Sequence, residues 1–565
     1  MKTTTKLYFM ICLCVSVVPS CEAQSTAGTH SFPAIGMTEQ RQVDVAWNRF
    51  YDCEGFEVIL KRLNQAFPDL TRLISLGQSV GGRTLWCLQV TAFKQGDPNR
   101  KAGMYIDGNI HGNEVQCGEA VLYTAWYLCH QYGKLDKVTD LLNERVFYLV
   151  PTINPDGRDT WLHNPHTASS SRSGIAPTDN DRDGLIDEDD ADDLNGDGHI
   201  TQMRISDPYG RYKPHPDFPE TLMVRVEPGK QGQYSLLGRE GIDNDQDGRI
   251  NEDGLGGYDM NRNWAFDWQP EYVQRGAKDY PFCLPETRAI AQFIMAHPNI
   301  ATAQSYHNTG GMILRGPGRE GGDMPGQDAQ VLATIAARGE KILPFYRSLV
   351  IYDDLYTTWG SELDWFYGAC GILPYSNEMW SRKNLYKDDQ GPSSEQNTEF
   401  IKHVLMEDGL IPWQPYDHPT YGPIEIGGTP KHWGRVPPSF LLEEELHRNM
   451  AFTLFHADMM PLVRLSDVTV KPLAENLYEI WITLENQRLM ATRAQQDIAN
   501  HISSPDKICL QGQTVKVLSS GIVQDRFFRR IDPVKHHPEC IKLDSIRGMS
   551  PARVQFIVAG TGRFT

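Results

Sequence analysis

The chain has 565 residues, of which 40% are hydrophobic and 22% are charged, and its formal net charge is −18 at pH 7. This length exceeds that of one ordinary domain, so about two to four domains are expected. The acidic excess argues against nucleic acid as a partner, because binding a phosphate backbone requires a basic surface.

The first residues are typical of an export signal. Two lysines precede an apolar run over residues 7–18, which is too short to span a bilayer. Small residues near Ala23 offer a cleavage site, so residues 1–23 are predicted to be a signal peptide and the protein to be secreted or periplasmic. Cys21 follows a lipobox-like sequence weakened by Pro19, so a lipid anchor at Cys21 stays open as an alternative. No membrane span is predicted.

Residues 43–160 alternate between strand and helix patterns. Apolar runs at 101–110 and 144–153 are typical of buried strands, and residues 119–133 of a helix. Such alternation implies the α/β class, a mostly parallel sheet with helices on its faces.

The stretch from 162 to 257 interrupts this pattern. It is rich in Asp, Gly and Pro and too long for a plain loop, so we expect it to be functional or internally stabilised. The α/β pattern then resumes, which marks the stretch as an insertion. Strands are expected at 299–306 and 371–380, and helices at 285–298, 327–342 and 439–459.

The sequence pattern changes again after residue 462. The expected strands at 477–486, 514–520 and 553–560 are short and separated by turn residues. The organisation predicted is thus an α/β domain over 43–460 followed by a small all-β sandwich over 462–565.

The eleven cysteines include three in the leader, and the other eight are scattered. None of them has the CxxC spacing of a zinc–thiolate site, so such a site is not expected. The sequence leaves disulfides and buried free thiols as equal alternatives.

A candidate metal site begins with His111 and Glu114, between a predicted strand and a predicted helix. Side chains three positions apart can turn toward one point at such a junction, and both types are ordinary zinc ligands. The pair alone would equally suit a surface histidine and a helix-start glutamate. His307 follows a predicted strand and supplies a third ligand, which completes the set of a catalytic zinc site with one open position.

Further polar residues lie at strand ends or in adjacent loops, where open α/β sheets place their sites. Arg262 offers a fork suited to a carboxylate, and Asn261 adds a donor. Asp259 can accept a hydrogen bond from a ligating histidine. Glu378, at the end of an apolar strand, can act as general base on a metal-bound water.

Together these segments resemble the carboxypeptidase A-like zinc carboxypeptidases, in a secreted, bacterial-type form. In the family's order the chain has HGNE (111–114), NPDG (154–157), DMNRNW (259–264), SYH (305–307) and a run from Tyr356 to Glu378 with the family's spacing. The resemblance covers roughly residues 43–380, apart from the insertion. It implies a metallocarboxypeptidase that removes residues from the C-terminal ends of peptides or proteins.

The resemblance also implies roles for the residues. His111, Glu114 and His307 bind Zn²⁺, which lowers the pKa of its water from about 15.7 to about 7. Glu378 deprotonates that water and passes the proton to the leaving amine. Asn261 and Arg262 hold the terminal carboxylate of the substrate, and Tyr356 closes over the site.

The resemblance implies two further roles. The family uses a further arginine, between NPDG and NRN, to stabilise the oxyanion. Arg172 is favoured here, with the competitors Arg158, Arg182 and Arg204. Leu363 stands where the family lines its side-chain pocket, so an apolar or aromatic terminal residue is expected rather than Lys or Arg.

The insertion contains three loops that resemble calcium loops of EF-hands or thrombospondin type 3 repeats. Alternate carboxylates can wrap one hard cation, and the following glycine permits the sharp turn. Position twelve lacks the bidentate glutamate, and without an ion such carboxylates repel one another. We expect Ca²⁺ to order the insertion at the rim of the zinc cleft, with the second loop the weakest. The candidate ligands are Asp179, Asp181, Asp183, Asp187 and Asp190; Asp193, Asn195 and Asp197; and Asp243, Asp245 and Asp247.

Two other functions stay open. A related zinc amidohydrolase would act on bacterial cell-wall peptides or N-acyl amino acids. A non-catalytic binding module would have lost a zinc ligand or the catalytic glutamate, and both are present here. Asn261, Arg262 and Tyr356 favour a substrate with a free terminal carboxylate.

Overall fold

The computed structural model describes residues 34–38, 41–322 and 324–563. The signal peptide predicted over residues 1–23, with Cys21, lies outside the described residues. The chain divides into two units, Met1–Arg41 and Gln42–Thr565, and the fold lies in the second. Within the described ranges, no helix combines the length and apolarity needed to cross a bilayer.

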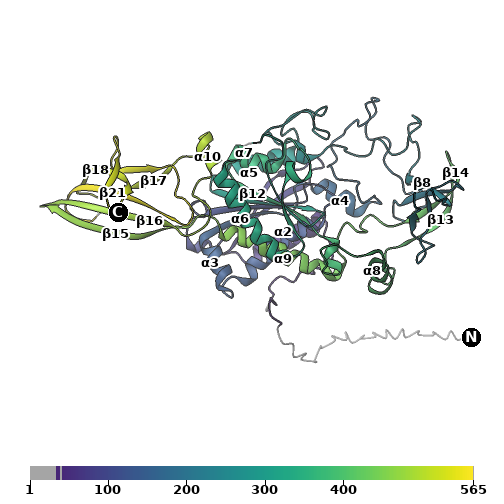
Figure 1. Cartoon of the computed structure of the whole chain (residues 1–565), viewed down its shortest axis with the longest axis horizontal. Helices are drawn as coiled ribbons and strands as arrows, with labels where there is room; N and C mark the ends of the chain where they lie inside the picture. Colours follow the sequence, from purple (N-terminus) through teal and green to yellow (C-terminus); the bar gives the residue numbers. More distant parts are fainter. Residues whose placement is uncertain (1–33, 39–40, 323, 564–565) are drawn as a thin grey trace, which may run out of the picture. The chain divides into compact units, whose positions relative to one another are not determined.

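An eight-stranded mixed sheet forms the centre of the larger unit (Figure 1). Its inner strands β4, β3, β9 and β12 are mutually parallel, and so are β10 and β11. The pairs β1–β2, β2–β4 and β12–β10 are antiparallel. In spatial order the strands are β1 (Thr71–Gln78), β2 (Thr84–Val90), β4 (Arg145–Val150), β3 (Ala102–Gly108), β9 (Ile300–Asn308), β12 (Leu373–Met379), β10 (Met312–Arg315) and β11 (Arg347–Val350).

Helices cover both faces of this sheet, which confirms the predicted α/β class. Alternate residues of one strand join different cores: Met104 and Ile106 pack with α1, α2, α6 and α9, and Tyr105 packs with α5 and α7. Burial on both sides explains why the inner strands are apolar along their whole length. The helices are α1 (Cys53–Ala66), α2 (Gln116–Gln131), α3 (Asp136–Glu144), α4 (Pro155–His163), α5 (Pro285–Ala296), α6 (Gly326–Ile342), α7 (Glu362–Cys370), α8 (Ser394–Glu399) and α9 (Ser439–Asp458).

Short helical turns connect several of these elements. They are η1 (Phe93–Gln95), η2 (Pro98–Arg100), η3 (Met260–Arg262), η4 (Ile351–Leu355), η5 (Arg382–Leu385) and η6 (Phe400–Val404). Among them, η3 contains Asn261 and Arg262, and η4 directly precedes Tyr356.

The insertion contains a second sheet of six antiparallel strands, in the order β13-β14-β5-β8-β6-β7. Two of its strands come from beyond the insertion, and Met203 packs with Ile424 and Ile426 in its apolar core. The insertion is therefore stabilised by a sheet of its own, which β13 and β14 complete from outside it. The strands are β5 (Gln202–Ser206), β6 (Tyr212–Pro214), β7 (Met223–Arg225), β8 (Tyr234–Arg239), β13 (Ile411–His418) and β14 (Gly422–Gly428).

The C-terminal region is an antiparallel β domain, as predicted. A five-stranded sheet and a two-stranded sheet share one apolar core, and a disulfide joins Cys509 to Cys540 on the two-stranded sheet. Six other described cysteines are free thiols. The elements are β15 (Val463–Ala474), β16 (Leu477–Asn486), β21 (Ser550–Gly560), β18 (Val515–Asp525) and β19 (Arg530–Pro533) in one sheet, β17 (Asp506–Cys509) and β20 (Cys540–Leu543) in the other, and the helix α10 (Gln495–Asn500).

Candidate functional site

His111, Glu114 and His307 converge at the carboxyl end of the central parallel strands. His111 and Glu114 lie between β3 and α2, and His307 lies near the end of β9. All three are buried, and their ligand atoms lie within 4.8 Å of one another. Nδ1 of His307 is 3.2 Å from Nδ1 of His111 and 3.2 Å from Oε2 of Glu114. Two imidazoles and one carboxylate are the ligand set of a catalytic zinc ion with an open position, so these residues fit Zn²⁺.

The outer ring nitrogens of both histidines face carboxylates. Nε2 of His111 is 2.9 Å from Oδ1 of Asp259, and Nε2 of His307 is 3.2 Å from Oε1 of Glu362. Each ring therefore presents Nδ1 to the centre while its Nε2–H donates outward, which fixes the tautomer and the ring orientation. The sequence predicts Asp259 in this position.

The sequence does not predict Glu362. Glu362 is fully buried at the start of α7. From the sequence alone, a glutamate at a helix start is expected only to interact favourably with the helix dipole. Ser305 Oγ contacts both Glu362 and Oδ1 of Asp107, the latter at 2.6 Å. Burial and the charge of Glu362 raise the pKa of the Asp107 carboxyl well above its usual range. The Ser305 hydroxyl thus links Asp107 to Glu362, the carboxylate that faces Nε2 of His307.

Charge compensation keeps two carboxylates of the centre ionised. Burial acts to raise the pKa of the Glu114 carboxyl, but His111 and His307 hold that pKa well below its usual range. The pKa of Asp259 is likewise lowered against the effect of burial, by Arg262, His111 and Arg172. Glu114 is therefore in the form that ligates a metal, and Asp259 in the form that accepts from a histidine.

Glu378 lies in β12 as the register partner of His307 in the adjacent parallel strand. Directly paired residues of neighbouring strands project from the same face of a sheet, so both side chains emerge toward the metal ligands. Burial and then the charge of Glu114 raise the pKa of the Glu378 carboxyl. A carboxyl with a raised pKa beside a metal centre suits proton transfer.

Of the four candidate arginines, only Arg172 reaches the metal ligands. Its Nη1 donates to Oε1 of Glu114 at 3.2 Å, and its Nε and Nη2 donate to Oδ2 of Asp259 at 3.3 and 3.2 Å. The competitors form ion pairs elsewhere: Arg158 with Glu119, Arg182 with Glu271, and Arg204 with Glu425.

A second arginine at the centre was missed by sequence reasoning. Arg435 follows β14, and its Nη2 lies 3.4 Å from Oε1 of Glu114 and donates to Oδ1 of Asn113 at 3.1 Å. Its carbonyl oxygen accepts from Nδ2 of Asn308 at 3.0 Å. The local sequence around Arg435 carries no signal of this role, because the contact is made entirely by tertiary packing.

Asn261 and Arg262 form η3, next to the centre. Oδ1 of Asn261 accepts from the backbone N–H of Glu362 at 2.8 Å, so it also positions the start of α7. Nη2 of Arg262 lies 3.9 Å from Oδ2 of Asp259. Arg262 is thus held by its charge beside the same carboxylate that supports His111.

The other two predicted substrate residues differ in exposure. Tyr356 follows η4 and is 57% exposed. Leu363 is 2% exposed and packs against Leu314 and Ile351, in an apolar cluster.

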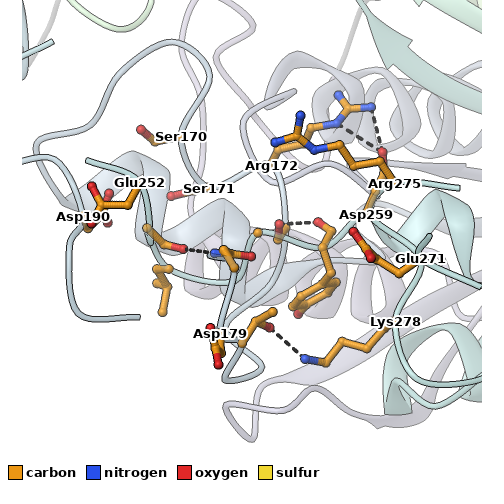
Figure 2. A pocket seen from close by; sticks show the side chains of 18 of the residues that line it. Ser170, Ser171, Arg172, Asp179, Asp190, Glu252, Asp259, Glu271, Arg275 and Lys278 are labelled. Carbon is orange, nitrogen blue, oxygen red and sulfur yellow. Dashed lines mark hydrogen bonds and ion pairs between the residues drawn. The ribbon is translucent and has the colours of Figure 1, made fainter. Parts of the chain in front are cut away.

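A cavity of about 1180 Å³ lies beside the centre. It is lined by Arg172 and Asp259 and also by acidic residues of the insertion, among them Asp179, Asp190 and Glu252 (Figure 2). The insertion therefore borders the cavity that contains the partners of the metal ligands.

The first acidic loop (179–190) and the third (243–254) have the same turn. Gly184 and Gly248 have φ of +100° and +94°, a conformation that glycine tolerates, and each donates its N–H to the first aspartate of its loop at 3.1 Å. Ligand atoms of Asp179, Asp181 and Asp183 lie within 4.8 Å of one another.

Later positions of these loops are arranged differently. Asp187 accepts from the N–H of Gly256 at 3.0 Å, and Asp190 from that of Ala191 at 2.8 Å. In the second loop, Gly198 donates to Asp193 at 2.9 Å, and the chain enters β5 at Gln202. The tenth position of the second loop is therefore Gln202, a strand residue that offers no carboxylate to a cation.

A family model described as zinc carboxypeptidase matches residues 56–224 and 233–400, more than half of the chain. A second model, for a domain of unknown function, matches residues 462–565. Carboxypeptidase D of Rattus norvegicus is 38% identical over 154 residues, which are 25% of this chain and 11% of that protein. Carboxypeptidase M of Mus musculus is 35% identical over 113 residues, 19% of this chain and 25% of that protein. The chain thus spans only a small part of the length of these relatives.

Among solved structures, thrombin activatable fibrinolysis inhibitor (TAFI) is 16% identical with a TM-score of 0.45, over 74% of this chain and 78% of that chain. Carboxypeptidase A from Helicoverpa armigera is 15% identical with a TM-score of 0.44, over 74% of this chain and 76% of that chain.

Proposed function

Because this chain belongs to the zinc carboxypeptidase family, we propose that it hydrolyses the last peptide bond of peptides or proteins with a free C-terminus. The observation that carries the proposal is the buried set of His111, Glu114 and His307, with Glu378 as the register partner of His307. A non-catalytic module would not need a base beside a complete zinc ligand set.

The residues of the centre divide the steps of this reaction among them. Zinc, when bound by the triad, supplies a Lewis acid that polarises the carbonyl and lowers the pKa of water to about 7. Glu378 accepts a proton from the attacking water as the water oxygen forms a bond to the carbonyl carbon. The same carboxyl then returns that proton to the amine nitrogen as the C–N bond breaks. Arg172 places its guanidinium where negative charge develops on the carbonyl oxygen.

Binding of the chain end is assigned to Asn261, Arg262 and Tyr356. A guanidinium fork and an amide donor suit a terminal carboxylate, and the exposed Tyr356 closes over it. We assign an apolar or aromatic residue to the terminal position of the substrate. The apolar cluster of Leu363 with Leu314 and Ile351 supports this preference, because it offers no charge to a Lys or Arg side chain.

A hydrolysis screen tests this function. Peptides that differ only in the terminal residue, together with C-terminally amidated copies, are incubated with the zinc-loaded wild type and with Glu378→Gln. We expect free acids with apolar termini to be trimmed, amides to resist, and Glu378→Gln to lose about 10²–10⁴-fold in kcat. Equal cleavage of amides, or of cell-wall peptides in preference to plain ones, would overturn the proposal.

We propose further that the protein is exported and that the acidic loops bind calcium outside the cytoplasm, where sites of millimolar affinity suffice. The leader over residues 1–23 supports export. Asp179 and Glu252 line the same cavity as Arg172, so an ordered insertion restricts which substrates enter. The test is activity and melting temperature with and without calcium at fixed zinc. Equal values in both conditions would contradict it.

A further inference from the structure

The first and third acidic loops face each other as a pair. The N–H of Asp189 donates to the carbonyl of Asp253 at 3.2 Å, in an isolated antiparallel bridge. These two residues hold the same position, the eleventh, in their respective loops. The two loops are therefore arranged symmetrically about this bridge, so that a contact made by one position of one loop has a counterpart made by the same position of the other.

Side-chain hydrogen bonds between the two loops have the same symmetry. Nδ2 of Asn180, at the second position of the first loop, donates to Oδ1 of Asp253 at 2.7 Å. Nδ2 of Asn244, at the second position of the third loop, donates to Oδ1 of Asp189 at 2.8 Å. In each loop, the asparagine at the second position thus donates a hydrogen bond to the aspartate at the eleventh position of the other loop.

Carboxylate clusters that contain residues of both loops result, and a cluster of Asp183, Glu188 and Asp245 lies between two matching ones. Ligand atoms of Asp181, Glu188 and Asp253 lie within 4.8 Å of one another. So do those of Asp245, Glu252 and Asp189, which are the symmetric counterparts. In each of these two matching clusters, positions three and ten come from one loop and position eleven from the other.

Buried oxygens without partners point to a ligand. Asp253 is fully buried, and no donor from the described part of the chain reaches its Oδ2. All four carboxylate oxygens of Glu188 and Glu252 are also buried without a donor. Arg249 lies 3.5 Å from Oδ2 of Asp181, but its side chain is 64% exposed. Buried carboxylates are costly unless a cation or donors compensate them, and these five oxygens have no donor among the described residues.

We propose that these loops form one unit with two reciprocal calcium sites, each completed by an aspartate from the opposite loop. The first site uses Asp181, Glu188 and Asp253, and the second uses Asp245, Glu252 and Asp189. Clusters that offer only oxygen ligands and several carboxylates suit calcium, whereas magnesium retains most of its water. The inference rests on the proposed binding of calcium and adds the ligands and their exchange.

The position of the unit gives it a structural consequence. The first loop lies at the start of the insertion and the third at its end, shortly before Asp259. Ions bound between the two loops connect the first part of the insertion to its last part. This connection restrains the segments that carry Arg172 and Asp259.

Double variants of the full chain, freed of calcium by chelation and then reloaded with zinc, test the exchange by calcium titration calorimetry. Glu252→Gln weakens the second site, whose other ligands are Asp245 and Asp189. Adding Asp253→Asn should then weaken the remaining site by about tenfold or more, although Asp253 lies in the same loop as Glu252. Adding Glu220→Gln, an exposed acid of the insertion outside the loops, should change nothing.

A pair in the first loop, Asp181→Asn with Asp189→Asn, is an independent copy of the test if one double variant fails to fold. An unchanged affinity of the remaining site in both double variants would overturn the exchange while leaving calcium binding intact. A wild type that binds no calcium would overturn the proposed binding itself.

Discussion

At the scale of single residues, the centre depends on what lies behind the ligands. Asp259 and Glu362 each accept from one histidine, and such acceptors orient the ring and raise its basicity. The two histidines are therefore supported in the same way, by carboxylates from different segments.

The role of Glu362 leads to a prediction about zinc affinity. Glu362→Gln keeps the shape of the side chain but removes the charge that faces Nε2 of His307. We expect zinc affinity to fall about 10- to 100-fold, measured by competition with a chelator.

Asp364→Asn is the matched control for this prediction. Asp364 lies on the same helix turn but accepts from Ser361 and Gly318 rather than from a histidine. Its substitution should leave zinc affinity unchanged. Equal effects of the two variants would mean that Glu362 acts only through the stability of α7.

Arg172 carries a prediction about rate. Arg172→Gln removes the guanidinium beside Glu114, so kcat should fall about 10²–10³-fold with a smaller change in KM. Arg182→Gln, an exposed arginine on the first acidic loop, serves as the control and should retain full activity. A loss confined to KM would instead assign Arg172 to ground-state binding of the substrate.

At the scale of elements, α9 buries a histidine that must stay neutral. His456 is fully buried against Thr302 of β9, and burial lowers its pKa to about 3. Below its ordinary pKa of about 6.5 the unfolded chain gains a proton on this residue that the folded chain excludes. Stability is therefore lost as the pH falls from about 6.5 toward 3, by ~1.4 kcal/mol per pH unit from this residue alone.

The measurement is chemical unfolding at pH 6.5 and at about pH 4.5, compared between wild type and His456→Gln. The variant should show a shallower loss of unfolding free energy than the wild type, by ~2–3 kcal/mol over this range. His403→Gln is the control, because His403 is exposed and its substitution should keep the slope of the wild type. Identical slopes for wild type and His456→Gln would contradict the prediction.

The elements also show where sequence patterns stop being informative. Long apolar runs identify the central strands and α2, because these elements are buried along their length, and α5, α6 and α9 are identified by apolar residues at helical spacing on their buried faces. Strands β5 to β8 are short and pair with β13 and β14, which lie far along the chain, so no local pattern reveals them. The zinc ligands could be predicted because each lies in a local motif at a strand end. Glu362 and Arg435 could not, because only packing brings them to the ligands.

At the scale of the whole molecule, the C-terminal β domain is not an independent appendage. Met490 and Ala494 lie beyond residue 462, yet they belong to the core cluster that contains α2, α6 and α9. The backbone N–H groups of Gln495 and Gln496 donate to Asp328 near the start of α6, at 3.0 and 3.1 Å. Stability of the α/β core therefore depends on residues of the C-terminal region.

Met490→Ala tests this dependence. Met490 is 1% exposed within the shared core, so its truncation should destabilise the α/β domain by ~2–5 kcal/mol and lower its melting temperature. Met549→Ala, in the same C-terminal region but 69% exposed, should leave the melting temperature nearly unchanged. If the zinc-dependent transition melted at the wild-type temperature in Met490→Ala, the two domains would have to be stabilised separately, and the C-terminal region would be a removable module.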